Sequence, residues 1–415
     1  MRQSATTVAD IFSRAARTAL RIATVTIAAG ALAACASAPP SARVSDGGSG
    51  GGGSSRAADA PTPRVDPNAP IRIALLAPTT AASRTASRIA QDLTAAAQIA
   101  LSQHGPANLT MKVYDTDGTT AGAATAAGHA VREGATLILG PLTAESTASA
   151  APVAARAGLN MISFSSDPSV AGGNVWVLGQ LVGDEMRRVF GYAGSQGVGA
   201  IAVIHPNDRY GKAVAAASGA AARDAGVRVG PVLGYERSFE GIEAATKANA
   251  GSIRSSGADG VLIADHGDGL RSTASFLSYY DVSPRSFRFL GLSRWDDPNN
   301  ASESPLQGGW FAAADPARHA AFTENFAMKL SRQPSPLATI GYDAVVAASD
   351  ILKAAKTGGP PAFTAAAISA GVHEGATGTF RLTEDGLNRR ALAVMEMTAD
   401  GPAVLDPAPF AAPGA

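Results

Sequence analysis

Cysteine is almost absent from this chain: Cys35 is the only one among 415 residues. A single cysteine excludes a disulfide within the chain and any metal site built from several thiolates. Aromatic residues make up only 6% of the sequence, and 34 basic side chains are balanced by 34 acidic ones. The chain therefore lacks the basic stripe and the stacking platforms of a nucleic-acid groove, and we expect no nucleic-acid partner.

Motifs that indicate an enzyme are missing as well: no Gly-x-Ser-x-Gly elbow follows a strand, and there is no His-Glu-x-x-His. Asp265-His266-Gly267-Asp268 suggests a metal site or a general base, but the six histidines are scattered, which favours a solvated loop. Asp115 and Asp117 resemble a calcium loop, yet Ala123 and Ala126 follow where further oxygen ligands are needed, which favours a turn and helix cap. We expect no enzymatic activity, no cofactor and no metal.

An apolar stretch at residues 22–34 follows four arginines and is shorter than the roughly 18 residues of a membrane-spanning helix. This is the pattern of a signal peptide. It ends in Leu32-Ala33-Ala34-Cys35, which resembles a bacterial lipobox. The resemblance implies a cleaved signal peptide at 1–34 and a lipid anchor on Cys35, and Ala36 in place of an aspartate implies the outer membrane. The alternative is an incidental cysteine after an uncleaved signal.

The remaining chain divides into a linker and a regular region. Residues 35–70 are dominated by Gly, Ser, Ala and Pro, and such a segment buries too little apolar surface to become ordered. From Ile71 onward, strand-like apolar runs alternate with helix-like segments. This alternation predicts an α/β fold with parallel sheets covered by helices on both faces. About a dozen elements exceed one ordinary domain, so we expect two lobes.

The segment at 137–167 holds the first candidate site. Two strand-like runs, at 137–139 and 159–163, enclose one helix that begins after Thr143 as its N-cap and stops at Gly158. Ligands of open α/β sheets bind beyond the carboxyl ends of the strands, beside helix N-termini. The loops at 141–146 and 163–167 are therefore candidates for binding a small molecule, and ordinary turns are the alternative.

Five stretches, in order along the chain, resemble the type I periplasmic binding proteins, in particular the leucine/isoleucine/valine receptors: 138–146, 159–166, 204–211, 289–291 and 341–344. The resemblance implies two Rossmann-like lobes with parallel sheets, joined by three crossovers, that hold the ligand between them. We place the crossovers near Gly179, Gly291 and Gly375. The corresponding segments are 71–178 and 292–375 for the first lobe, 179–291 and 376–399 for the second lobe, and 400–415 for a C-terminal tail.

The same resemblance implies a set of ligand-binding residues. In the family, hydroxyl and N–H groups of two first-lobe loops bind the α-carboxylate of the ligand. Tyr210 matches the family's cleft tyrosine, although half-buried packing is the alternative for a lone tyrosine at a helix start. The residues that match the two loops are Thr143, Ala144, Ser146, Ser165, Ser166 and Asp167.

Three positions depart from the family pattern. Ser293 stands where amino-acid receptors carry an acid for the ligand's ammonium group. The loop at 265–268, with His266, replaces an aromatic residue and could supply a substitute acid from another direction. Glu145 would repel a ligand carboxylate placed at the same helix end. We therefore expect a neutral polar solute, a peptide fragment or no tight ligand in place of a free branched-chain amino acid.

Trp295 follows a strand end near the second expected crossover, within Ser293-Arg294-Trp295-Asp296-Asp297. It has two interpretations. It lines the cleft or contacts a partner, or it packs at the hinge.

Two roles fit these observations. The first is a receptor that presents a small polar solute, of the amino-acid, amide or peptide class, to an ABC permease. The second resembles the penicillin-binding-protein activators, outer-membrane lipoproteins that reach a peptidoglycan synthase, and the stretch LATIGYDA at 337–344 is similar to that group's. Both roles place the protein on the periplasmic face of the bacterial cell envelope, anchored to the membrane through Cys35.

Overall fold

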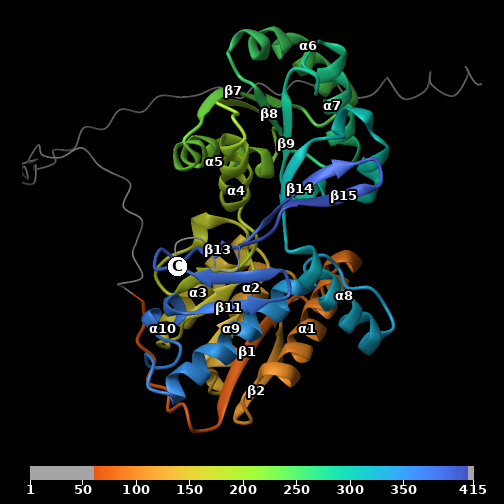
Figure 1. The fold of residues 1–415 in the computed structure, drawn as a ribbon. Coiled ribbons are helices and arrows are strands. Elements are labelled where there is room, and N and C mark those ends of the chain that lie inside the picture. The colour runs from red at the N-terminus through yellow and green to blue at the C-terminus, as the bar shows by residue number, and fades with distance from the viewer. Residues whose placement is uncertain (1–59, 410–415) are drawn as a thin grey trace, which may run out of the picture. The chain divides into compact units, whose positions relative to one another are not determined.

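The computed structural model describes residues 60–409. The expected signal peptide, Cys35 and most of the linker lie outside these residues, as do residues 410–415. Two lobes, each with a mainly parallel sheet covered by helices, confirm the α/β fold expected from the sequence (Figure 1). Within residues 60–409, no helix combines the length and the apolar run needed to span a bilayer.

The first lobe is built on a parallel sheet in the order β2-β1-β3-β4-β5. Its central strands are buried on both faces because helices cover both sides. α1 and α9 pack on one face, and α2 and α3 cover the other. The strands are β1 (Ile71–Ala77), β2 (Leu109–Asp115), β3 (Leu137–Leu139), β4 (Met161–Ser163) and β5 (Val175–Val177), and the helices are α1 (Arg84–His104), α2 (Thr120–Arg132), α3 (Ala144–Arg156), α8 (Pro316–Leu330), α9 (Ala338–Lys356) and α10 (Ala365–Ala370).

The second lobe has a seven-stranded sheet in the order β15-β14-β10-β9-β8-β6-β7. Five strands are parallel, and β14 and β15 add an antiparallel edge. α4 and α5 cover one face, and α6 and α7 cover the other. The strands are β6 (Ala200–Pro206), β7 (Arg228–Tyr235), β8 (Gly260–Ile263), β9 (Arg288–Gly291), β10 (Trp310–Ala313), β14 (Ala393–Thr398) and β15 (Gly401–Asp406), and the helices are α4 (Val182–Ser195), α5 (Arg209–Ala225), α6 (Phe239–Ser255) and α7 (Gly267–Tyr279).

Short elements complete the fold. A small antiparallel sheet, β11 (Val372–Gly375), β12 (Gly378–Leu382) and β13 (Asn388–Arg390), belongs to the first lobe because Phe380 and Leu382 enter its core. Within residues 60–409 the 3-10 turns are η3 (Pro168–Val170), η4 (Ser293–Trp295), η5 (Pro298–Ser302) and η6 (Ser304–Leu306).

Local sequence signals determine where α3, the helix beside the first candidate site, begins and ends. The Thr143 side chain accepts a hydrogen bond from the Ser146 backbone N–H at 3.2 Å, which satisfies one unpaired donor at the start of α3. Gly158 follows the helix with φ +74°, a left-handed conformation that glycine adopts without a Cβ penalty. The N-cap and the stop were both predicted from the sequence.

Two of the three expected crossovers lie elsewhere. The first passes at 178–181, beside Gly179. The second is not near Gly291, because β10 pairs with β9 and keeps the chain in the second lobe until residues 314–315. The third is not near Gly375, because β11 to β13 stay in the first lobe, and it passes at 391–392. Residues 292–313 therefore belong to the second lobe and 376–390 to the first, which corrects those two boundaries (Figure 1).

Trp295 is a core residue of the second lobe. Its side chain is 0% exposed, and its indole N–H donates to the Ile263 carbonyl oxygen at 2.9 Å. Gly291 and Gly309 leave room for the ring, since a Cβ at Gly291 would lie 2.2 Å from it. The interpretation that Trp295 lines the cleft or contacts a partner is therefore wrong.

Candidate ligand-binding cleft

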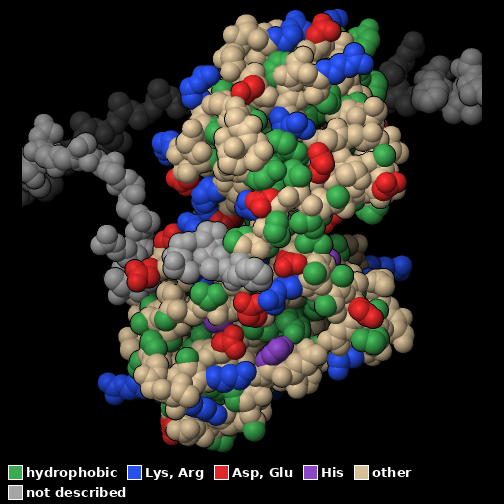
Figure 2. All heavy atoms as spheres, in the orientation of Figure 1, with side chains coloured by type: hydrophobic (Ala, Val, Ile, Leu, Met, Phe, Trp, Pro, Cys, Tyr) green, Lys and Arg blue, Asp and Glu red, His purple; other side chains and the backbone are tan. Residues whose placement is uncertain are grey.

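A cavity of about 1320 Å³ lies between the two lobes, next to all three crossovers. Second-lobe side chains from α4, α5 and η4 form one wall, and α8 with the loop before α9 forms most of the other. The charges that line it are mixed, as they are on the molecular face drawn in Figure 2. The charged or titratable lining residues are Glu185, Tyr210, Arg294, Asp296, His319, Glu324 and Arg390.

Glu185 is the buried acid of this cavity. It lies in the first turn of α4, and its carboxylate accepts hydrogen bonds from the backbone N–H and the hydroxyl of Ser293, each at 2.9 Å. Burial raises its pKa from the ordinary 4.5 to about 7, against the opposing effect of the Ser293 donors and of the nearby Arg294 charge. An acid therefore does reach the position of Ser293, contrary to the sequence-based expectation that this place had lost its counter-charge.

Sequence reasoning missed Glu185 because it lies 108 residues before its partner Ser293. Its only local signal is the pair Asp184-Glu185 at the start of a helix. That pattern is common, since carboxylates are favourable near any helix N-terminus.

Tyr210 and Arg294 stand beside Glu185. The Arg294 guanidinium lies 3.9 Å from the centre of the Tyr210 ring, a cation–π arrangement. The Tyr210 hydroxyl is buried and has no hydrogen-bond partner within residues 60–409, and burial, then the Glu185 charge, raises the pKa of this phenol. A buried polar atom without a partner costs about 1–3 kcal/mol, so the hydroxyl is suited to receive a ligand atom.

His266 lies behind Arg294 and does not line the cavity. Its Nδ1 is 3.3 Å from an Asp265 carboxylate oxygen and 3.4 Å from the Arg294 Nη1. Burial and then the Arg294 charge lower the pKa of His266, and Asp265 opposes them. Asp265 itself is paired with Arg237 at 2.8 Å and accepts from the Tyr235 hydroxyl, so it is occupied within the protein.

The first-lobe loops satisfy much of their polarity internally. The Ser165 hydroxyl oxygen accepts from the Asp167 N–H at 3.0 Å, and the Asp167 carboxylate accepts from the Ser169 N–H at 2.9 Å. Of the six first-lobe residues expected to bind ligand, Ser166 lines the cavity. The other five, Thr143, Ala144, Ser146, Ser165 and Asp167, lie beside it without lining it.

One second-lobe arginine joins these loops to the other lobe. The Arg209 Nη1 lies 2.5 Å from the Glu145 carboxylate, and its Nη2 lies 2.8 Å from that of Asp167. The backbone N–H of Glu145 and then Arg209 hold the pKa of Glu145 below its usual value. Two carboxylates and one guanidinium give this group of three side chains a net negative charge.

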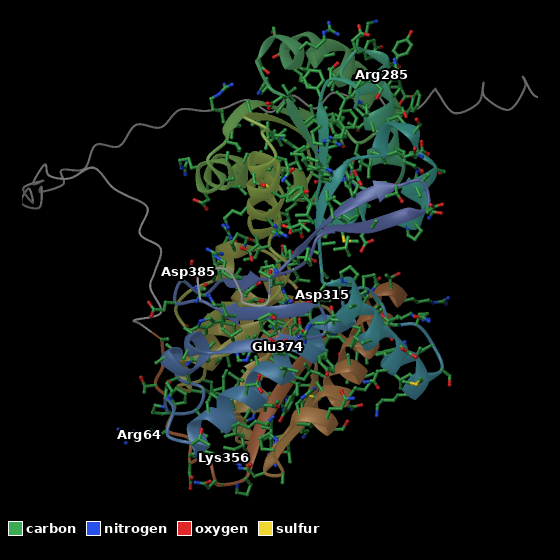
Figure 3. All side chains as sticks on the ribbon, viewed as in Figure 1. Arg64, Arg285, Asp315, Lys356, Glu374 and Asp385 are labelled. Atoms are coloured by element: carbon green, nitrogen blue, oxygen red, sulfur yellow. The ribbon has the colours of Figure 1, made fainter. Side chains whose placement is uncertain are left out.

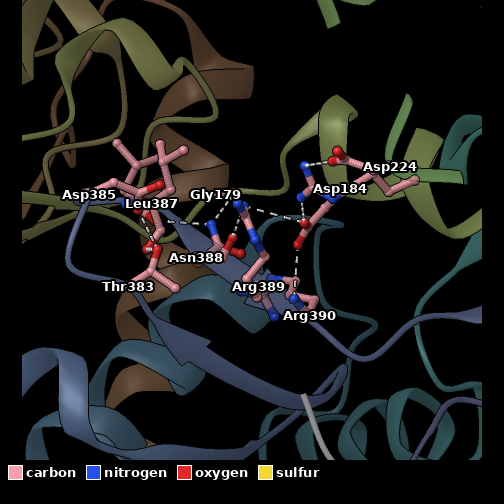
Figure 4. A network of polar contacts seen from close by, with 11 residues as sticks. Gly179, Asp184, Asp224, Thr383, Asp385, Leu387, Asn388, Arg389 and Arg390 are labelled. Carbon is pink, nitrogen blue, oxygen red and sulfur yellow. Dashed lines mark hydrogen bonds and ion pairs between the residues drawn. The ribbon is translucent and has the colours of Figure 1, made fainter. Parts of the chain in front are cut away.

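A buried polar network holds two crossovers together at the back of the cavity (Figure 4). The Arg390 guanidinium donates to Asp343 at 2.8 Å and to the Leu178 carbonyl oxygen at 2.9 Å, and its backbone N–H donates to Asp184 at 2.9 Å. The Asn388 amide donates to the Gly179 carbonyl oxygen at 2.9 Å. These hydrogen bonds fix the first and third crossovers to each other.

The two α/β lobes that enclose this cavity are similar to known proteins. A family model described as "Periplasmic binding protein" matches residues 70–402. The chain belongs to the periplasmic binding protein family. No match was found among curated proteins.

Solved structures of ligand-binding proteins are similar to this chain in fold. A branched chain amino acid ABC transporter periplasmic ligand-binding protein from Burkholderia xenovorans is 15% identical with a TM-score of 0.63, covering 81% of this chain and 94% of that one. An ABC transporter substrate-binding protein from Desulfitobacterium hafniense in complex with Leu is 20% identical with a TM-score of 0.59, covering 81% and 99%. A solute binding protein from R. palustris in complex with benzoate is 16% identical with a TM-score of 0.56, covering 81% and 96%. At these identities the likeness establishes the type I fold.

The raised pKa of Glu185 predicts that the stability of this periplasmic binding protein depends on pH. A carboxyl whose pKa is about 7 when folded and 4.5 ordinarily binds more protons in the folded state between these pH values, so stability falls as pH rises through that window. The full penalty above pH 7 is about 3 kcal/mol. We expect Glu185→Gln to raise the thermal midpoint at pH 8 and to leave it nearly unchanged at pH 5, in scanning calorimetry.

Glu240→Gln is a matched control, because Glu240 also lies in the first turn of a helix but is exposed. It should show no difference between the two pH values. An equal gain for Glu185→Gln at pH 5 and pH 8 would contradict the raised pKa.

Proposed function

We propose that this chain is a non-enzymatic solute receptor of the cell envelope, which binds a small polar solute of the amino-acid, amide or peptide class between its lobes and presents it to an ABC permease. The observation that carries the proposal is the inter-lobe cavity with a buried acid, Glu185, and an unsatisfied hydroxyl, Tyr210. A buried ionisable group with a perturbed pKa in a concave site is a binding-site signature.

The similar proteins support the same class. Those described above are named as ABC transporter ligand-binding proteins, one in complex with Leu and another with benzoate. The proposed location is the periplasmic face of the envelope, with a lipid on Cys35 and the outer membrane favoured by Ala36. Ser166, Ser293 and Tyr210 are the sequence-derived site residues that line the cavity, and they belong to the proposed binding surface.

Titration calorimetry of the purified full chain tests the receptor role. The twenty amino acids, a set of dipeptides and benzoate are titrated at pH 7.5. We expect one-to-one binding of at least one of them with a micromolar dissociation constant, because the cavity presents the buried Glu185 carboxyl and the unpaired Tyr210 hydroxyl to a ligand. Absence of binding across the set would remove the support for a solute receptor.

A second candidate is the activator of a peptidoglycan synthase. The observation that favours it is a group of exposed apolar side chains around the loop between α8 and α9, where Met328 is 72% exposed and Leu330 and Leu337 are each 36% exposed. Exposed apolar groups of this kind suit a protein partner. Co-purification of the full chain with a synthase, together with no solute binding, would favour this candidate over the receptor.

The stretch at 337–344 does not itself offer a surface for such a partner. After Leu337 it runs into α9, where Ala338, Asp343 and Ala344 are fully buried. Gly341 packs directly on α1, since a Cβ there would lie 2.3 Å from the Leu93 carbonyl oxygen. Its sequence is explained by helix packing within the first lobe.

A further inference from the structure

We propose that the first lobe carries a second binding site, separate from the cleft, for a phosphate-type dianion. The ligand is inorganic phosphate or a phosphomonoester, either a soluble compound or the head group of a lipid. Arg84, Arg88 and Arg332 supply the positive charge. The proposal goes beyond the receptor function and does not rest on it, because an anion can bind here whether or not the cleft holds a solute.

The site is a cavity of about 350 Å³ between the first turns of α1 and the loop that joins α8 to α9. It shares no lining residue with the inter-lobe cavity. Its volume lies at the lower end of the roughly 300–1,000 Å³ of ordinary ligand sites, which fits a small molecule or a head group. No acid of the described chain lines it. The lining consists of three guanidinium groups, a hydroxyl, an amide and a methyl group, from Arg84, Arg88, Arg332, Ser87, Gln91 and Ala81.

Arg84 and Arg88 bring two positive charges that the surrounding chain does not balance. They lie four residues apart on α1 and therefore share one face of the helix. The first turn of α1 contains no acidic residue, and within residues 60–409 neither arginine forms an ion pair; the nearest acid along the chain, Asp92, pairs with Arg332. Like charges at this spacing, placed at a helix N-terminus, are unfavourable for the helix itself. A bound anion would replace both repulsions with attraction.

Arg332 is held in place by the protein. Its Nη1 donates to the carboxylate of Asp92, which is fully buried and also accepts the Ser335 backbone N–H at 2.9 Å. Its guanidinium carbon lies 5.4 Å from the centre of the Phe326 ring. Asp92 offsets the charge of Arg332 but leaves other N–H donors of the guanidinium at the cavity. A donor that is fixed before binding loses little entropy when an anion arrives.

The helix that carries the other two arginines is fixed as well. The Ser87 hydroxyl donates to the Thr79 carbonyl oxygen, in the loop after β1, at 2.6 Å. The Gln91 amide in turn donates to the Ser87 oxygen at 3.4 Å. Because these bonds tie the lining face of α1 to the loop after β1, the arginines project from a rigid element, as a specific site requires.

The charges favour a phosphate-type dianion over a single carboxylate. Asp92 offsets one of the three positive charges that line the cavity, so two remain. A phosphomonoester carries about two negative charges at neutral pH and offers three acceptor oxygens. Arginine presents a planar fork of donors that binds two such oxygens at once. Two uncompensated guanidinium groups and one anchored guanidinium therefore match this group in both charge and donor geometry.

Titration calorimetry of the full chain with glycerol 3-phosphate tests the site, in a buffer without phosphate or sulfate. The second ionisation of a phosphomonoester has a pKa of about 6, so the probe carries about two charges at pH 8 and one at pH 5. We expect binding at least about 10-fold tighter at pH 8, because guanidinium groups stay charged across this range. Sulfate, a dianion at both pH values, should bind with nearly equal affinity at both. It controls for titration of Asp92 and Asp115, the acids behind the site.

Two variants test the residues of the site. Arg84→Gln and Arg88→Gln should each weaken glycerol 3-phosphate at least about 10-fold at pH 8, because each removes a charge-assisted pair of donors. Both side chains are exposed, so the variants should fold as the wild type does.

Arg64→Gln and Arg285→Gln are matched controls, because both arginines are exposed and neither lines the cavity. Arg285 lies on the second lobe, and Arg64 lies at the end of the first lobe away from Asp315, the N-cap of α8 (Figure 3). Both variants should bind the probe with wild-type affinity.

Dihexanoyl phosphatidic acid, a soluble short-chain lipid with the same phosphomonoester, separates the two sources of the ligand. Clearly tighter binding than that of glycerol 3-phosphate would assign the site to a lipid head group, and equal or weaker binding would assign it to a soluble anion. Both results agree with the proposal.

Three results would overturn it. Glutarate, a dicarboxylate like those an acidic peptide presents, would exclude a phosphate site if it bound as tightly as glycerol 3-phosphate. Wild-type affinity in both Arg84→Gln and Arg88→Gln would place the anion elsewhere. Absence of binding by every anion would remove the site altogether, and solute titrations of the cleft would still decide the receptor function separately.

Discussion

Replacing Trp295 with alanine should lower the free energy of unfolding by about 3–5 kcal/mol, the range found for removing a buried large aromatic side chain. The ring fills a space in the second-lobe core beside Phe311, with the two ring centres 6.2 Å apart. Its removal also leaves the Ile263 carbonyl oxygen without its indole donor. Urea unfolding followed by far-UV circular dichroism measures the change.

Tyr279→Ala is a suitable comparison for that experiment, because Tyr279 is 78% exposed on the same lobe. It should unfold close to the wild-type midpoint. If Trp295→Ala retained wild-type stability and lost only ligand affinity, the core assignment would be wrong and Trp295 would belong to the binding surface.

Asp343→Ala should be as damaging, with an expected loss of about 3–5 kcal/mol, because it leaves the buried Arg390 guanidinium without its counter-charge. The Ala376 N–H also loses its acceptor at 2.7 Å. Arg390 bonds to the first crossover and lies next to the third. The loss of stability should therefore appear in the cooperative unfolding of the chain, measured by urea denaturation.

A double variant separates the effect of the unpaired charge from the effect of lost packing. Asp343→Leu with Arg390→Met replaces the pair by apolar side chains, and it should be clearly more stable than Asp343→Ala. Asp268→Ala is the control, because Asp268 is 98% exposed in its pair with Arg271 and such a pair contributes little. A double variant no more stable than Asp343→Ala would show that the damage comes from lost packing rather than from the unpaired charge.

The alternation of elements was enough to predict two α/β lobes, because hydrophobic period and turn residues are local properties. The same signals predicted the start of α3 at Thr143 and its end before Gly158. They did not predict which sheet β10 joins. A short apolar run such as 310–313 has the same pattern at either sheet, and only its pairing with β9 and β14 decides the lobe.

The residues that line the cavity were harder to predict from the sequence, because they come from segments far apart in the chain. Tyr210 and Ser293, which the sequence analysis names as candidate site residues, line the cavity. The acid bonded to Ser293 comes from α4, and no local pattern joins residues 108 positions apart. Trp295 illustrates the converse: it neighbours a cleft residue in sequence, yet its side chain points into the core.

Glu185 connects stability and function in this account. A buried carboxyl with a pKa of about 7 destabilises the folded chain at neutral pH, although it accepts two bonds from Ser293 and lies in the first turn of α4. A cationic group of a ligand in the cavity would favour the ionised carboxyl and offset this cost. The pH-dependent stability of Glu185→Gln and its effect on ligand binding should therefore change together.

A crystal structure of the full chain with a bound amino acid tests the central claim most directly. The account predicts ligand density in the inter-lobe cavity, in contact with Glu185 and with the Tyr210 hydroxyl. Density outside the cavity, or a ligand in the cavity that touches neither Glu185 nor Tyr210, would contradict it.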